Sequence, residues 1–240
     1  MNKSSLLLTG LILFTVLGIS ACNGFDCVNG SGNQVSQNRS TDSFTKIETS
    51  GSMKIVLKQD SASNVRIIAD DNIQREIETR VHGNTLVIDM KGNFCDSGPI
   101  TVYLSSENYE GIDASGAVEI ESDGKLNVND FELELSGSSK VSLDLNAATM
   151  RTSSSGASEI NLRGQAGSHN LDLSGSSSVK ALDFVVGKYR IESSGASDSR
   201  INVLNELNVS SSGSSDIQYR GNPARITNDD SGASSLRKIN

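Results

Sequence analysis

The sequence predicts an all-β protein: a parallel β-helix, or β-solenoid, with coils of about 19–20 residues and a β-rich N-terminal cap. Three observations support this fold class. Ser-Gly turns recur through the second half of the chain, apolar residues stand at a fixed offset on both sides of each turn, and the flanking segments alternate between apolar and polar residues. Repeats of this length stack as coils, and alternation with period two marks strands with one buried face.

The repeat is measured from glycine to glycine in successive Ser-Gly turns. The steps are 21, 19, 19, 20, 18 and 19 residues, between Gly116, Gly137, Gly156, Gly175, Gly195, Gly213 and Gly232. An earlier Ser50-Gly51-Ser52 has the same flanks, so Gly51 is expected at the first corner. Because glycine adopts positive φ without steric penalty, we expect all eight glycines at sharp corners in that conformation, with small Ser and Ala neighbours that let the coils stack closely.

Two columns of residues are expected to face the interior. Four residues after each glycine stand Ile120, Val141, Ile160, Val179, Ser199, Ile217 and Leu236. Four residues before it stand Ile112, Leu133, Thr152, Leu171, Ile191, Val209 and Asn228. Flexible linkers carry no such columns, and glycine about every 19 residues with almost no apolar spacing of three or four disfavours helices. We favour a right-handed solenoid for coils of this length.

Residues 1–21 resemble a bacterial lipoprotein signal peptide. An apolar run from Leu6 to Ile19 leads through small residues to Cys22. The run is shorter than the about 20 residues that a membrane-spanning helix needs, which disfavours a transmembrane anchor. The resemblance implies that Cys22 becomes the lipidated N-terminus. By analogy with other bacterial lipoproteins, Asn23 favours the outer membrane, with the side that the protein faces left open.

The charge of the chain excludes one class of partner. Cleavage before Cys22 removes one of the 21 basic residues, Lys3, and none of the 29 acidic residues. The mature chain then carries 20 basic and 29 acidic residues, a formal charge of −9. Because nucleic acid binding depends on neutralising phosphates with Lys and Arg, nucleic acid is not expected as a partner.

Residues 22–43 are rich in Gly, Asn and Ser, a composition typical of a flexible tether, here between the lipid and the domain. Cys27 lies within this segment, and Cys95 is the only other cysteine apart from Cys22. Export to an oxidising compartment favours a Cys27–Cys95 disulfide, with two free thiols as the alternative. Two distant cysteines and two histidines lack the spacing of metal ligands, so we expect no metal site and no cofactor.

Residues 44–110 are β-rich but irregular, and they are predicted to cap the Ser-Gly repeat solenoid of residues 111–240. A cap is needed because an open stack of strands presents unpaired edges. Residues 73–80 allow either a short helix, started by the Asp and Asn residues before them, or a strand. Further strands are expected at Val65–Ala69, Leu86–Met90 and Ile100–Leu104.

The position three residues after each glycine forms an outward ladder if the coils stack in register. Its charged members are Glu119, Lys140, Glu159, Asp198 and Asp216. A lysine between two glutamates relieves like-charge repulsion along such a ladder. The ladder is a candidate binding face for a polar polymer such as a glycan, and the alternative is a solvated face that keeps the rod soluble. The glycine–aspartate nonapeptide pattern of calcium β-rolls is absent.

No set of residues identifies a reaction, so an enzyme is not expected. His82 and His169 each stand alone among polar residues and are expected at the surface, not as general bases. The serines belong to corners and form no Gly-x-Ser-x-Gly elbow. A polysaccharide lyase or hydrolase remains the low-ranking alternative, with groove pairs such as Asp183 with Lys180.

Several segments together resemble the head-GIN domain family of auto-transporter adhesins, which are secreted or lipid-anchored proteins common in Bacteroidetes. The resemblance covers roughly residues 44–230. It is carried by the Ser-Gly turns and by Ile19–Cys22, Phe44–Ile55, Asp70–Ile73 and Pro99–Tyr103. It implies a β-helical domain likened to the head of trimeric surface adhesins, and it offers no catalytic motif.

Two functions of different class follow from these observations. The first is a lipoprotein with an adhesin-like head that binds glycan or protein at the cell surface. The second is a structural or envelope-stress lipoprotein that faces the periplasm. The heads of trimeric adhesins are held together by coiled-coil stalks, and no heptad run follows residue 232. We therefore expect a monomer or a weak homo-oligomer.

Overall fold

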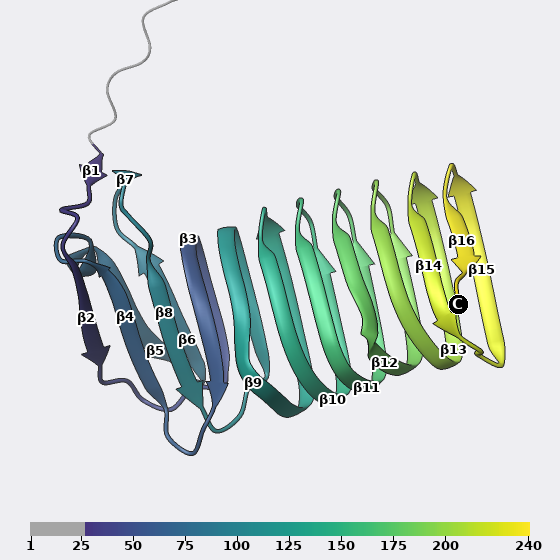
Figure 1. The fold of residues 1–240 in the computed structure, drawn as a ribbon, viewed down its shortest axis with the longest axis horizontal. Helices are drawn as coiled ribbons and strands as arrows, with labels where there is room; N and C mark the ends of the chain where they lie inside the picture. The colour runs from purple at the N-terminus through teal and green to yellow at the C-terminus, as the bar shows by residue number, and fades with distance from the viewer. Residues whose placement is uncertain (1–26) are drawn as a thin grey trace, which may run out of the picture.

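The computed structural model describes residues 27–240, which form a β-solenoid with a β-rich N-terminal end (Figure 1). The predicted signal peptide, the lipidation site Cys22 and the first residues of the predicted tether lie outside the described residues. Long strands make up the solenoid body, one for each coil: β9 (Gly111–Gly137), β10 (Lys140–Ser154), β11 (Glu159–Leu173), β12 (Ser178–Ser193) and β13 (Asp198–Gly213).

Strands β10 to β13 each bend near the middle, so that their two halves belong to two facing layers (Figure 1), and β9 has in addition the run Gly111–Ser115 before its corner at Gly116. We call the halves that follow a corner glycine the leading sheet and the halves that precede one the trailing sheet. In β10, Val141, Leu143 and Leu145 face the interior from the leading sheet, and Met150 and Thr152 face it from the trailing sheet. The two sheets therefore enclose one continuous apolar core, which no single coil could bury alone.

Successive coils pair in parallel, and both predicted columns follow this pairing. Val141 lies between Ile120 and Ile160, and all three side chains are buried. Ser199 keeps the same register and is buried. Asn228 departs from the expectation, because it is exposed in the final coil, where the described chain provides no further coil to cover it.

The corner glycines adopt two conformations, which corrects the expectation of a positive φ at all eight. The φ angle lies between +82° and +113° at Gly51, Gly116, Gly137, Gly213 and Gly232. At Gly156, Gly175 and Gly195 it is not positive, and glycine is required there for a different reason. A Cβ atom on Gly175 would lie 2.0 Å from the carbonyl oxygen of Gly156. That oxygen accepts a hydrogen bond of 2.9 Å from the Ser176 N–H, so the corners stack too closely for a side chain.

A second feature of the corners is a buried column of serines two residues after the glycines. Its members are Ser139, Ser158, Ser177, Ser197 and Ser215. The Ser177 hydroxyl lies 2.9 Å from the hydroxyl of Ser154, which stands beside the preceding corner, and it accepts a 3.3 Å bond from the Ser158 N–H. The hydroxyls of Ser158, Ser177, Ser197 and Ser215 form hydrogen bonds inside the corners, whereas the Ser139 hydroxyl has no partner among the described residues.

The N-terminal cap consists of shorter strands. They are β1 (Val28–Asn29), β2 (Gln34–Arg39), β3 (Lys46–Gln59), β4 (Asn64–Asp70), β5 (Ile77–His82), β6 (Thr85–Met90), β7 (Phe94–Asp96) and β8 (Thr101–Ser106), with a 3₁₀ turn at Ile73–Arg75. Residues 73–80 thus contain a short helical turn followed by a strand. Within β3, Gly51 pairs with Gly116, so the first regular corner already lies in the cap.

The flexible tether predicted for residues 22–43 is wrong for its described part. Strand β2 pairs antiparallel with β4 and forms the outermost strand of the cap. Cys27 and Cys95 form a disulfide with Cα atoms 5.5 Å apart, beside the β1–β7 pair. The polar composition misled the prediction, because an edge strand exposed on one side needs few apolar residues.

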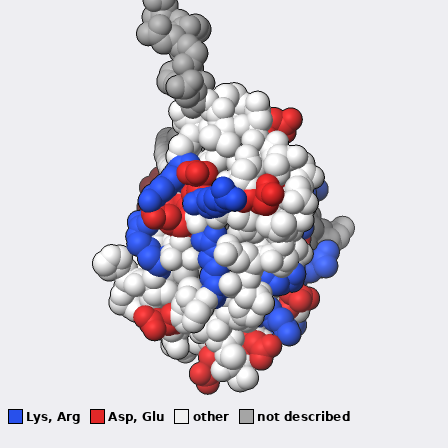
Figure 2. Space-filling view, turned by 90° about the vertical axis from the view of Figure 1, so that its left-hand side faces the viewer, with Lys and Arg blue, Asp and Glu red and all other residues white. Residues whose placement is uncertain are grey.

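Both ends of the stack carry polar or charged side chains. Figure 2 looks onto the N-terminal end, where Lys and Arg side chains gather near the middle with Asp and Glu among them. At the C-terminal end, β14 (Asp216–Gly221) and β16 (Ser235–Lys238) continue the leading sheet, and β15 (Arg225–Gly232) continues the trailing sheet. Asn228 and Asp230 occupy inward positions of β15 and are hydrogen-bonded to each other. Inward polar groups discourage another strand from adding to an edge.

His169 corrects another expectation, because its side chain is fully buried in the core. Its Nε2 atom lies 2.9 Å from the Thr152 hydroxyl. Its ring contacts Phe184 edge-on and lies 5.1 Å, between centroids, from the ring of Tyr189 in the next coil. Among the described residues, Nδ1 of His169 and the Tyr189 hydroxyl have no hydrogen-bond partner. His82, by contrast, is exposed in β5, as expected.

Candidate functional site

The two coils with the longest glycine-to-glycine steps interrupt the residue-for-residue pairing of the leading sheet. In β9, Glu121 pairs with Ser142 of β10 and Lys125 pairs with Asp144, so residues 122–124 lie opposite Leu143 alone. This is the coil of 21 residues. Extra residues in one strand of a pair form a β-bulge, which bends the strand and redirects side chains.

The second bulge lies in β12, the coil of 20 residues. Asn161 of β11 pairs with Lys180, and Arg163 pairs with Asp183, so Ala181 and Leu182 lie opposite a single residue. Both bulges occur in the leading sheet, at about the same distance from the corner. Strands β10 and β11, whose coils have the regular length of 19 residues, lie between them.

Side-chain contacts hold each bulge in place. The Ser122 hydroxyl accepts a 2.9 Å hydrogen bond from the Asp144 N–H, and Lys125 Nζ lies 3.4 Å from a carboxylate oxygen of the same aspartate. The Leu182 carbonyl accepts hydrogen bonds from Asn202, at 3.1 Å, and from Arg220. The bulges are therefore parts of a preformed surface with defined contacts.

A groove with a volume of about 1050 Å³ runs across the leading sheet over both bulges, from Val56 and Tyr103 on the cap side to Arg200 of β13. We call it the trough. Asp123 and Asp183 of the two bulges line it, and the outer face of β10 and β11 is its floor. The bulged strands β9 and β12 are three strand spacings apart, or about 14 Å. The outward side chains of the floor are Lys140, Ser142, Asp144, Glu159, Asn161 and Arg163.

The predicted outward ladder runs along the corner side of the trough. Lys140 pairs in register with Glu119 on one side and Glu159 on the other, and Asp198 pairs with Asp216 farther along. Ser178 separates Glu159 from Asp198. Of the charged ladder residues, the structure brings only Lys140 and Glu159 into the trough itself.

Ion pairs join the ladder to the next outward column. Lys180 Nζ lies 2.6 Å from Glu159, and Lys54 Nζ lies 2.8 Å from Glu121. The hydrogen bond from Lys180 lowers the pKa of Glu159 below its usual value, and the hydrogen bond with Glu121 raises the pKa of Lys54. These pairs are exposed, so each contributes little to stability.

Asp216 is the most strongly perturbed carboxylate of the ladder. Hydrogen bonds from Ser235 and then Arg237 lower its pKa to about 2. Asp198 contacts Arg200 at 3.8 Å. Arg237 and Ser235 therefore hold the carboxylate of Asp216 in an ion pair and a hydrogen bond. Residues 27–240 contain no group of three His, Cys, Asp or Glu side chains that could hold a metal ion.

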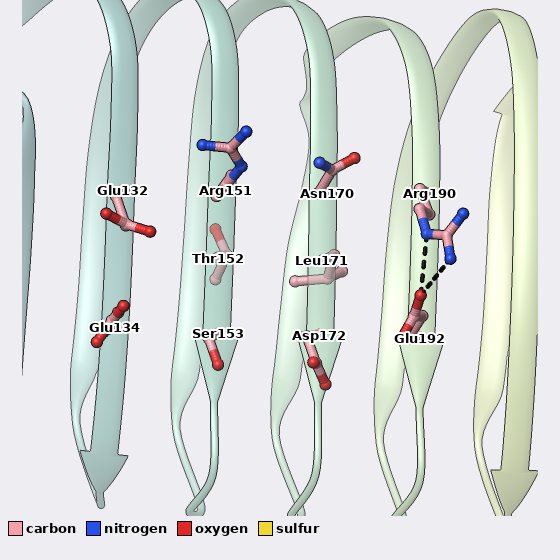
Figure 3. Close-up of a pocket in the computed structure, with 10 residues that line it drawn as sticks. All are labelled: Glu132, Glu134, Arg151, Thr152, Ser153, Asn170, Leu171, Asp172, Arg190 and Glu192. Carbon is pink, nitrogen blue, oxygen red and sulfur yellow. Dashed lines mark hydrogen bonds and ion pairs between the residues drawn. The ribbon is translucent and has the colours of Figure 1, made fainter.

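The trailing sheet carries a shallower hollow on the opposite face, of about 270 Å³ (Figure 3). Arg151 of β10 and Asn170 of β11 lie side by side there and point outward from the same two strands that form the trough floor. Arg190 donates two hydrogen bonds to Glu192, of 2.6 and 2.9 Å. The trailing halves of β9 to β12, which line this hollow, pair without a register shift.

The sequence prediction missed the trough, although one signal for it was visible. The steps of 21 and 20 residues mark the two bulged coils, and the step from Gly195 to Gly213 is the shortest, at 18. Irregular step length shows that residues are added, but not on which side of the coil. The low-ranking enzymatic pair Asp183 and Lys180 lies in the trough, where Lys180 contacts Glu159 instead.

Residues 43–223 match the sequence family described as "Putative auto-transporter adhesin, head GIN domain". A comparison with curated protein sequences finds no match. The described residues include no helix with the length and apolar character needed to cross a membrane.

Several solved structures share the fold. A "putative adhesin" from Bacteroides fragilis has a TM-score of 0.82 at 20% identity, with 88% of this chain and all of that chain covered. Another from Parabacteroides distasonis has a TM-score of 0.69 at 19% identity, covering 89% and 100%. A "putative lipid binding protein" from P. distasonis has a TM-score of 0.62 at 20% identity, covering 89% and 99%. At these identities the likeness concerns the fold.

Proposed function

Because the chain belongs to the head GIN domain family, we propose that it is a lipid-anchored protein of the outer membrane whose solenoid binds glycan or protein at the cell surface. The anchor is Cys22, and the apolar run before it is the export signal. The observation that carries the binding role is the trough, a groove of about 1050 Å³ with a polar and charged floor and two bulges held by hydrogen bonds. Preformed concave sites with convergent polar groups are typical of ligand binding.

The protein acts as a monomer or a weak homo-oligomer in this proposal. Both ends of the stack carry charged or polar side chains, which oppose end-to-end association of solenoids. Catalysis is not part of the proposal. The buried His169 is out of reach of a substrate, and the carboxylate of Glu159 is held by Lys180.

Protease treatment of intact cells tests the location. The mature domain should be digested while a periplasmic marker protein survives, and a Cys22→Ser variant should leave the membrane fraction. If the domain is protected until the outer membrane is opened, the surface role is wrong and the protein is a periplasm-facing lipoprotein. Retention of the Cys22→Ser variant in the membrane would contradict the lipid anchor.

A further inference from the structure

We infer that the trough is a polysaccharide-binding site, which holds a glycan segment across strands β9–β12. The inference rests on the proposed surface function and names the ligand class and the residues that bind it. Lys140 and Asn161 are its central contacts, because they project from the two floor strands between the bulges.

The backbone of the floor cannot bind an extended peptide as an added strand. Strand β10 pairs with β9 and β11 on its two sides, and β11 pairs with β10 and β12. Every floor strand is therefore interior to the sheet and offers no free edge for main-chain hydrogen bonds, on which β-augmentation depends. A peptide would have to be held by its side chains alone.

The floor also lacks the apolar pockets that anchor peptide side chains or acyl chains. Its two leucines, Leu143 and Leu162, point into the core and expose 2% and 1% of their surface. Half-buried Tyr103 lies at the cap end of the trough, with the Arg66 guanidinium 4.0 Å from its ring centroid. Interfaces that capture proteins depend on buried aromatic or aliphatic anchors, which this floor does not provide.

What the floor does provide is a dense mixture of hydrogen-bond donors and acceptors. Lys140 offers only donors, Glu159 only acceptors, and Ser142 and Asn161 offer both. Sugar hydroxyl groups both donate and accept, so they can pair with every one of these side chains. A polymer that crosses the strands meets a new set of such groups on each coil, about 4.8 Å apart, and weak contacts add along it.

The bulges define where the polymer binds. They enclose about 14 Å of the leading sheet, and hydrogen bonds fix both before any ligand arrives, which lowers the entropic cost of binding. In β9, Ile120 and Leu126 face the core, and the five residues between them do not. Deleting Asp123 and Gly124 leaves three residues, which restores the 19-residue step and removes one bulge from the trough, and it places Ser122 at the inward position that Leu143 occupies in β10.

The test measures binding of the full mature chain, solubilised in detergent, to immobilised dextran, mannan, polygalacturonate and chondroitin sulfate. We expect at least one polysaccharide to bind. The double variant Lys140→Ala/Asn161→Ala and the deletion of residues 123–124 should each weaken that binding by about tenfold or more.

A matched control distinguishes the trough from the solenoid surface in general. Arg151→Ala/Asn170→Ala removes a cation and an amide from the same two strands, on the trailing sheet (Figure 3), and should leave binding unchanged. Circular dichroism and melting establish that all variants are folded.

Three results would overturn the inference. The first is no binding to any of the four polysaccharides, and the second is an equal loss in the control variant. The third is binding of a random peptide library that depends on Lys140 and Asn161. The protease experiment on cells is independent, so a surface-exposed domain that binds none of the polysaccharides leaves the surface proposal standing.

Discussion

Replacing the buried His169 should change how the stability of the protein depends on pH. Burial lowers the pKa of His169 from its usual 6.5 to about 3 in the folded protein. The unfolded chain takes up a proton below pH 6.5, and the folded protein does so only near pH 3. Stability is therefore fully present above pH 6.5 and is lost as pH falls from 6.5 toward 3.

The expected size follows from the pKa difference. At 1.36 kcal/mol for each pKa unit, the full loss is about 5 kcal/mol, and about 3 kcal/mol of it is lost by pH 4.5. His169→Met removes the titrating group and extends the column begun by Met150 in the preceding coil. The free energy of unfolding should then fall about 3 kcal/mol less between pH 7.5 and 4.5 than in the wild type.

Urea unfolding at the two pH values measures this difference. Carboxylates with lowered pKa, such as Glu159, add to the acid sensitivity of both proteins and cancel in the comparison. Leu171→Met is the control, because it alters packing in the same coil without a titrating group and should shift stability equally at both pH values. The reasoning is refuted if wild type and His169→Met lose the same free energy between pH 7.5 and 4.5.

Two further predictions concern the corners and the C-terminal edge. Gly175→Ala should lower the melting temperature much more than Gly124→Ala. A Cβ on Gly175 meets a carbonyl oxygen at 2.0 Å, whereas Gly124 has a φ of +91° but open space around it, and the penalty there is about 1–3 kcal/mol. The reverse order would show that close stacking does not require glycine at this corner. Asn228→Val/Asp230→Leu should make the protein self-associate at rising concentration, because it replaces the inward polar groups of the exposed edge strand β15 with apolar ones. Light scattering measures this, and a variant that remains as monomeric as the wild type would contradict the role of these two residues.

Much of the fold was predictable because it depends on local and periodic properties of the chain. Alternating residues such as Val141, Leu143 and Leu145 identify strands with one buried face, and the glycine spacing sets the coil length. The columns align because each coil buries the apolar row of the coil before it. These relations recur in every repeat, so one misplaced residue, such as Ser199, does not disturb them.

The sequence was a poorer guide wherever an environment depends on residues far away in the chain. His169 looks like a surface residue among polar neighbours, yet Thr152 of the preceding coil and Phe184 and Tyr189 of the next coil enclose it. The segment that looks like a tether becomes strand β2 because β4, about 30 residues later, offers it an edge. Composition alone does not reveal such a partner.

For this protein, the sequence by itself determined the solenoid, its coil length, its apolar columns and the in-register ladder, since all of these follow from a repeated pattern. Only the tertiary structure decided why three corners need glycine, and where the extra residues of the longer coils go. Corner carbonyls stack within 2.0 Å of where a Cβ would be, and both bulges fall on the leading sheet. Both facts arise from contacts between successive coils, and the period of the sequence does not encode the distances and register shifts of those contacts.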